Sequence, residues 1–108
     1  MTLESNLFYY AQQLKKYFEQ LEKQKQYSQY VFLCIGSKEM QGDSLGPLVG
    51  SCLESMLGQH EKVIIIGNMK RVLPYQEIHK CIQSVYTRYS NPCIIAIGCR
   101  TTGRTSRI

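Results

Sequence analysis

Three short apolar runs constrain the fold of this chain more than any other feature. They are YVFLCIG at residues 30–36, KVIIIGN at residues 62–68 and NPCIIAIG at residues 91–98. Runs of this length with no polar alternation are typical of strands that are buried on both faces of a parallel sheet. We therefore predict three strands in one short parallel sheet, with helices covering both faces.

Helical patterns separate these runs. The first is a stripe of apolar residues at alternating spacings of four and three: Leu7, Ala11, Leu14, Phe18 and Leu21. It predicts an N-terminal helix over residues 3–25, and similar stripes after GDSLGP (42–47) and after Pro74 predict two more helices. The resulting order is a helix followed by β-α-β-α-β, with crossovers long enough for parallel connections. Residues 1–97 are thus predicted to form one α/β domain with the first strand central.

Composition excludes several classes of protein. A chain of 108 residues suffices for one small domain, and no apolar run approaches the ~20 residues that a membrane helix needs. The opening segment has no basic region followed by an apolar core, so no secretion signal is visible. The five cysteines form no Cys-x-x-Cys pair, which predicts reduced thiols in a cytosolic protein. We expect no metal and no cofactor.

The positive charge is concentrated at the end of the chain. The net charge of +5 falls to +2 when Arg100, Arg104 and Arg107 are set aside. A nucleic-acid-binding protein would show a clustered basic face, whereas the other basic residues here are scattered. A nucleic-acid partner is therefore disfavoured. The tail, residues 98–108, has no apolar period and is predicted to be disordered.

The stretch GDSLGP contains a Gly-x-Ser-x-Gly pattern that invites comparison with serine hydrolases. A nucleophile elbow places its serine directly after a strand, but Ser44 follows Gly36 by eight residues. The reaction also needs a histidine held by a carboxylate. Only His60 and His79 are available, and no aspartate follows Ser44. The same objections apply to a GDSL-type esterase, so a serine hydrolase is a disfavoured alternative.

Asp43 is the only aspartate in the chain and the other candidate in this stretch. It stands where the lysine of a phosphate-binding P-loop would be, and its charge would repel phosphate. As a general base it would need a second acid, and Glu39 is the only other acid in the loop. From the residues alone, a helix cap formed by Asp43 or Ser44 is favoured. The candidate site loop and helix start comprise Gly36, Glu39, Gly42, Ser44, Gly46 and Pro47.

Two longer segments carry a family resemblance. VFLCIGSKEMQGDSLGPLVGSCLE, followed by a βα unit and NPCIIAI, resembles the sporulation protein YyaC family (DUF1256-type) over roughly residues 5–97. That family is related to the spore germination protease and, more distantly, to hydrogenase maturation proteases. The resemblance implies a three-layer α/β/α sandwich of the phosphorylase/hydrolase-like type with a Rossmann-like strand order. It also implies a peptidase of the mother cell or forespore cytoplasm, with Asp43 as the first of two catalytic acids.

The sequence departs from the family where the second acid is expected. Family members have an aspartate at the end of the third strand, and this chain reads IIAIGCRTTG, with Gly98 at that position. The later strands and helices are expected to be missing, and a frameshift near residue 97 would explain both differences. The resemblance therefore predicts a protein or peptide substrate but no activity in this form. A non-catalytic interaction protein is the alternative, and an exposed edge of the third strand predicts self-association.

Overall fold

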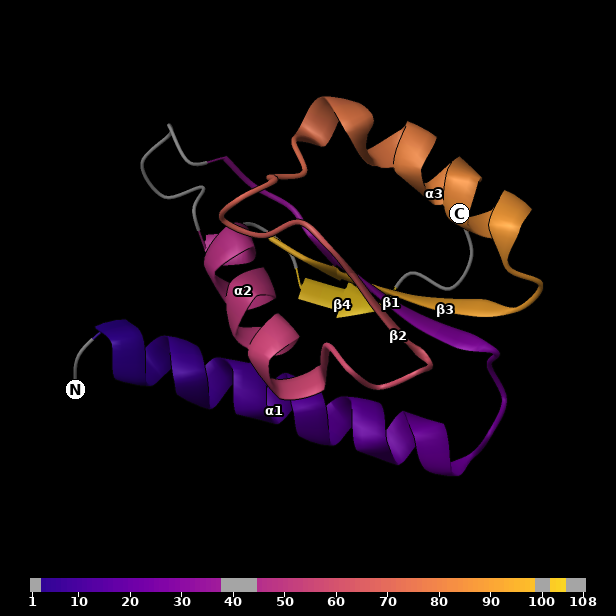
Figure 1. Cartoon of the computed structure of the whole chain (residues 1–108), viewed down its shortest axis with the longest axis horizontal. Coiled ribbons are helices and arrows are strands. Elements are labelled where there is room, and N and C mark those ends of the chain that lie inside the picture. The colour runs from indigo at the N-terminus through magenta and orange to yellow at the C-terminus, as the bar shows by residue number, and fades with distance from the viewer. Residues whose placement is uncertain (1–2, 38–44, 99–101, 105–108) are drawn as a thin grey trace.

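The chain folds as a helix followed by alternating strands and helices (Figure 1). The computed structural model describes residues 3–37, 45–98 and 102–104. The elements are α1 (Leu3–Lys23), β1 (Gln29–Cys34), α2 (Leu45–Leu57), β2 (Val63–Ile66), the short 3-10 helix η1 (Tyr75–Glu77), α3 (Ile78–Arg88), β3 (Pro92–Ile97) and β4 (Thr102–Arg104). The three predicted helices and three predicted strands are all present, with ends that differ by a few residues.

The sheet has the order β2-β1-β3-β4, so the first strand is central among the parallel strands as predicted. β1 pairs in parallel with both β2 and β3, and its register with β3 runs from Gln29↔Pro92 to Cys34↔Ile97. Every residue of β1 after Gln29 is buried. The uninterrupted apolar run therefore belongs to a strand that is covered on both faces.

The tail contains a strand, which corrects the prediction that residues 98–108 are disordered. β4 pairs antiparallel with the carboxyl half of β3, from Ile97↔Thr102 to Ile95↔Arg104. A short reversal after β3 can satisfy backbone groups along that open edge without any apolar pattern of its own. The third-strand edge is therefore covered over Ile95–Ile97, and the described residues provide no strand partner for its amino half. The self-association through this edge stays a prediction.

The helices form two layers on opposite faces of the sheet (Figure 1), which confirms the three-layer α/β/α sandwich. Alternate residues of β1 separate the two cores: Phe32 and Cys34 pack with α1 and α2, whereas Val31 and Leu33 pack with α3. The crossover through α2 leads from β1 to one side, and the crossover through α3 leads back past β1 to the other. Two crossovers of the same hand that run in opposite directions place their helices on opposite faces.

Glycines allow α2 to lie against the backbone of β1 and of the chain that follows β2. A Cβ on Gly46 would overlap the carbonyl of Ile35, and a Cβ on Gly50 would overlap the carbonyl of Gly67. Gly67 itself has φ +104°, and a Cβ there would overlap the carbonyl of Cys34. Since Gly46 and Gly50 are one helical turn apart, they present a single side of α2 that has no side chains. Only glycine permits this close approach.

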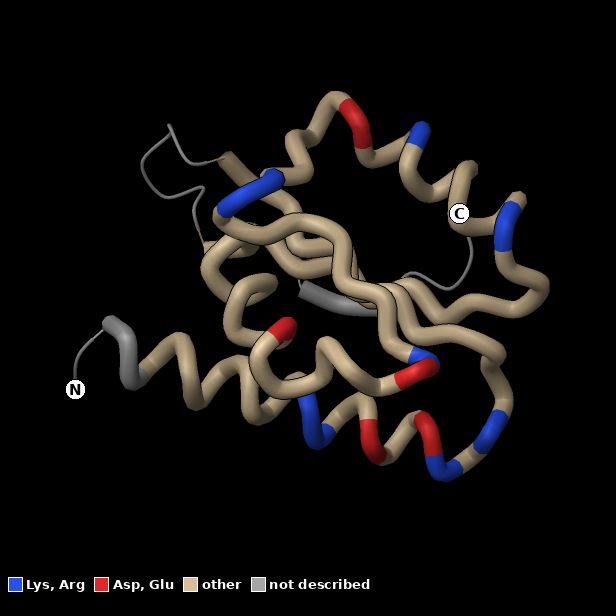
Figure 2. The backbone as a smooth tube through the Cα atoms, viewed as in Figure 1, with Lys and Arg blue, Asp and Glu red and all other residues tan. Residues whose placement is uncertain are grey.

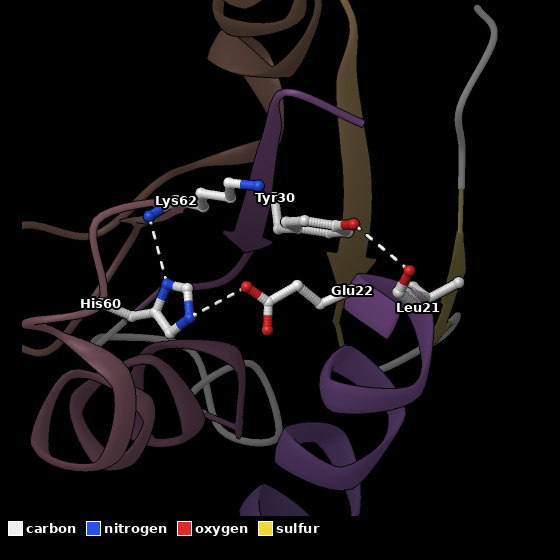
Figure 3. Close-up of polar contacts among 5 residues, drawn as sticks. All are labelled: Leu21, Glu22, Tyr30, His60 and Lys62. Atoms are coloured by element: carbon white, nitrogen blue, oxygen red, sulfur yellow. Dashed lines mark hydrogen bonds and ion pairs between the residues drawn. The ribbon is translucent and has the colours of Figure 1, made fainter. Parts of the chain in front are cut away.

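A histidine ties the end of α1 to the turn before β2 (Figure 3). His60 Nε2 lies 3.2 Å from Glu22 Oε2, and the backbone N–H of Lys62 donates to His60 Nδ1 at 3.2 Å. The ring also meets Phe18 edge-on, with 5.0 Å between ring centroids. Because Nδ1 accepts from Lys62, Nε2 carries the proton and donates to Glu22. The side chain of His60 is 32% exposed, so the residue lies at the boundary between the core and the surface.

We expect Gly50→Ala to lower the free energy of unfolding by about 2 kcal/mol or more, because α2 must move away from Gly67 to make room. Urea unfolding followed by circular dichroism measures the change. The matched control is Ser55→Ala on the exposed side of the same helix, for which we expect a change within about 0.5 kcal/mol. Equal stability of the Gly50→Ala variant and the unsubstituted chain would contradict the close approach.

We expect His60→Ala to cost about 1–2 kcal/mol, because it removes the contact with Phe18 and leaves the N–H of Lys62 without its acceptor. Glu22→Gln keeps an oxygen acceptor, so it should cost less than about 0.5 kcal/mol. Glu19→Gln, which alters an exposed pair with Lys15, is the control. If Glu22→Gln lowered the free energy of unfolding as much as His60→Ala, the contact between His60 and α1 would depend on charge rather than on packing and hydrogen bonding.

Candidate functional site

The carboxyl ends of β1 and β3 lie side by side. The backbone N–H of Ile35 donates to the carbonyl of Ile97 at 2.8 Å, so Gly36 and Gly98 follow directly after a paired position. The chain leaves β1 toward α2 on one face and reaches β3 from α3 on the other. This is the topological switch point of the sheet, the place where open α/β sheets form their ligand crevice.

The first turn of α2 closes one side of this edge. α2 begins at Leu45, and Gly46 and Pro47 are both buried in its first turn, as predicted for Pro47. Because Gly46 lies against the backbone of Ile35, the helix starts directly beside the end of β1. The N–H of Gly36 donates to the carbonyl of Leu73 at 3.0 Å, which fixes the beginning of the site loop.

The structure therefore brings together four of the predicted site positions: Gly36, Gly46, Pro47 and Gly98. The remaining predicted residues lie outside the described residues: Glu39, Gly42, Asp43 and Ser44. Both ends of the loop that carries them are fixed, one at Gly36 and the other at Leu45.

His60 does not lie at this edge, because it precedes β2 and is therefore near the amino ends of the parallel strands, at the other end of the sheet from Gly36. His79 is exposed in the first turn of α3, a helix that covers the opposite face of the sheet from α2. A Ser-His pair needs both side chains within hydrogen-bonding reach. The placement of the two histidines speaks against the serine-hydrolase alternative.

Thiol chemistry is also disfavoured near the site. Cys34 ends β1 and is completely buried, and burial, with a smaller contribution from Glu54, raises the pKa of its thiol to about 12. Burial and the nearby Glu77 raise the pKa of Cys81 as well. Since the thiolate is the nucleophile, Cys34 is unreactive at neutral pH. Within the described ranges, no three His, Cys, Asp or Glu side chains are grouped to hold a metal ion.

Sequence reasoning missed a second feature beside the switch point. The second strand was predicted over residues 62–68, but β2 ends at Ile66, and Gly67 with φ +104° turns the chain out of the sheet. A cavity of about 790 Å³ lies between this turn, β2 and α3. The Gly67-Asn68 pair after an apolar run is a turn signal that identifies the end of the strand.

The layers and the strand order define a small three-layer α/β/α protein in which β1 and β3 end side by side at the carboxyl edge of the parallel strands. The chain belongs to the family described as "Protein of unknown function (DUF1256)", which it matches over residues 3–107. It is also 33% identical over 67 residues to the uncharacterized protein YyaC of Bacillus subtilis (strain 168). That match covers 62% of this chain and 32% of the relative, so it spans about a third of the relative's length. No solved structure matches the chain.

The family match confirms the resemblance to the YyaC family. Its extent differs from the prediction in one respect, because it includes residues after Gly98 that we expected to fall outside the family. Among the described helices, none combines the length and the apolar character needed to cross a bilayer.

We expect N-ethylmaleimide at pH 8 to modify Cys52 at least about a hundredfold faster than Cys34, since the raised pKa of Cys34 removes its thiolate. Cys52 is partly exposed and serves as the internal reference. Peptide mass spectrometry after timed quenching gives both rates. In urea the two rates should become similar, and similar rates in the folded protein would contradict the burial of β1.

Proposed function

We propose that this chain is a sporulation-associated, YyaC-like protein with the site architecture of a germination-protease-like peptidase but without its full catalytic pair. The observation that carries the proposal is the hydrogen bond from Ile35 to Ile97. It sets the ends of β1 and β3 side by side, as a pair of acids following these strands would require. The second of those positions holds Gly98.

The chemistry of an acid pair explains why Gly98 matters. Two neighbouring carboxyl groups share a proton, so one accepts a proton from the attacking water while the other retains or donates one. Asp43 precedes α2 by two residues, near the end of the helix dipole that stabilises a carboxylate. An ionised Asp43 without a partner has no proton to donate to the leaving group. The chain is therefore proposed to bind a peptide or protein without cleaving it.

The similarity to YyaC supports a proposal for the cellular location as well as for the candidate site. We place the protein in the mother cell or forespore cytoplasm of a spore-forming bacterium. A purely non-catalytic interaction protein is the second candidate, and it is favoured by the same observation, since Gly98 supplies no carboxylate at the position of the second acid.

We expect the unsubstituted chain to leave an unstructured protein such as casein intact, and Gly98→Asp to introduce cleavage by restoring the second acid. Mass spectrometry of newly formed termini detects the products. Gly98→Asn is the matched control, because it has the same size but no carboxylate. Adding Asp43→Asn to Gly98→Asp should abolish the new activity.

Two results would count against parts of this proposal. Cleavage by the unsubstituted chain that Asp43→Asn abolishes would show that one aspartate suffices, and the inactive assignment would be wrong. If circular dichroism shows that the Gly98→Asp variant is folded and it has no activity, the proposed acid pair would be ruled out. The non-catalytic interaction protein would then be the remaining candidate.

A further inference from the structure

A loop leaves the sheet after β2 and returns to it. Leu33 pairs with Ile66, and the next pairing along β1 is Ile35 with Leu73. An advance of two residues along β1 thus corresponds to an advance of seven residues along the segment that follows β2. Residues 67–72, which we call the detour loop, are displaced from the sheet, and the positive φ of Gly67 begins the displacement.

The detour loop is held in one shape by its own asparagine. Asn68 Oδ1 accepts from the backbone N–H groups of Lys70 at 2.9 Å and Arg71 at 2.8 Å. The N–H of Asn68 in turn donates to the carbonyl of Arg71 at 3.1 Å. These three bonds close a tight turn, so the backbone that carries both cations is fixed before any ligand arrives.

Side chains of helix α2 also hold the detour loop in place. Asn68 Nδ2 donates to Glu54 Oε2 at 2.8 Å, and the N–H of Met69 donates to Ser51 Oγ at 3.2 Å. Because Asn68 uses both its side-chain oxygen and its nitrogen, the turn and one of its two anchoring bonds depend on this residue. The loop is built into the fold rather than being a loose connection.

The cavity beside the loop has an apolar floor and a positively charged rim. Its volume is about 790 Å³, within the ~300–1,000 Å³ of ordinary ligand sites. Lys70 and Arg71 line it from the detour loop, and Lys80 and Glu77 line it from the helical segments opposite. Figure 2 shows these charges on the turn between β2 and η1 and along α3. Three cations against one carboxylate favour an anionic partner, while the apolar lining includes Ile66 and Val85.

The outer edge of β2 supplies backbone groups to the same cavity. β2 is the edge of the sheet formed by the described strands. The N–H of Tyr30 donates to the carbonyl of Lys62 at 2.8 Å, so Lys62 and alternate residues after it face β1. In a parallel strand the residues that alternate with these direct their backbone N–H and C=O groups away from the neighbouring strand. The backbone groups of Ile65 therefore face the open edge of β2. A peptide can pair there as a further strand.

We propose that this groove binds an extended, acidic peptide segment as an additional strand on β2. The peptide's carboxylates face Lys70, Arg71 and Lys80, and its alternate apolar side chains point to the opposite face of the sheet, where the side chain of Ile65 lies. A small inorganic anion would use the rim but not the strand edge. The inference goes beyond the proposed function, since it uses neither Asp43 nor Gly98.

Fluorescence anisotropy with a labelled peptide that alternates Glu and Val tests the proposal. We expect saturable binding, and binding at least about tenfold weaker for the peptide with Lys in place of Glu. N-methylation of alternate amides should weaken binding to a similar extent, because it blocks strand pairing on one side. Equal binding of the N-methylated peptide would overturn strand addition.

Charge reversal in the protein locates the site. Arg71→Glu and Lys80→Glu should each weaken the acidic peptide about fivefold, since both side chains are exposed and neither bears on the core. Lys16→Glu, an equally exposed cation on α1, is the matched control and should leave binding unchanged. If Lys16→Glu weakened binding as much as Arg71→Glu, the attraction would be general to the basic protein and the groove assignment would be wrong.

Discussion

The close approach of α2 to the backbone after β1 and β2 is the constraint on which the rest of the structure depends. Gly46 lies against Ile35 and Gly50 lies against Gly67, with no side chain between the two backbones. Two glycines one turn apart fix both the position of the helix along the strands and its rotation about its own axis. The helix start, and with it the end of the site loop, is therefore set by packing rather than by the loop itself.

The central strand carries this constraint to both layers. β1 is buried along nearly its whole length and separates the two cores by simple alternation, with Phe32 on one side and Leu33 on the other. A shift of one residue in its register would exchange the two sets of side chains between the layers. The hydrogen bond from Ile35 to Ile97 at the switch point depends on the same register.

The sequence was sufficient to predict what depends on local pattern. Apolar runs located β1 and β3, and periodic stripes located the helices, because burial on both faces or on one stripe selects those patterns directly. β4 could not be predicted in this way, since Thr102–Arg104 has no pattern and pairs only because β3 leaves an open edge. The contact of His60 with Phe18 also depends on the fold, because it joins residues far apart in the chain. The candidate acid pair came from resemblance, and the described residues establish only the frame around it.

The two surfaces proposed to bind ligands share one structural support. The first turn of α2 closes the switch-point crevice through Gly46, and the next turns hold the detour loop through Ser51 and Glu54. Because Gly50 allows no gap between α2 and Gly67, the helix cannot slide toward one surface without disturbing the other. A ligand in the groove would therefore act on a helix that also ends the site loop. The position of α2 thus connects the two surfaces, through backbone contact at Gly46 and Gly50 and through the hydrogen bonds of Ser51 and Glu54.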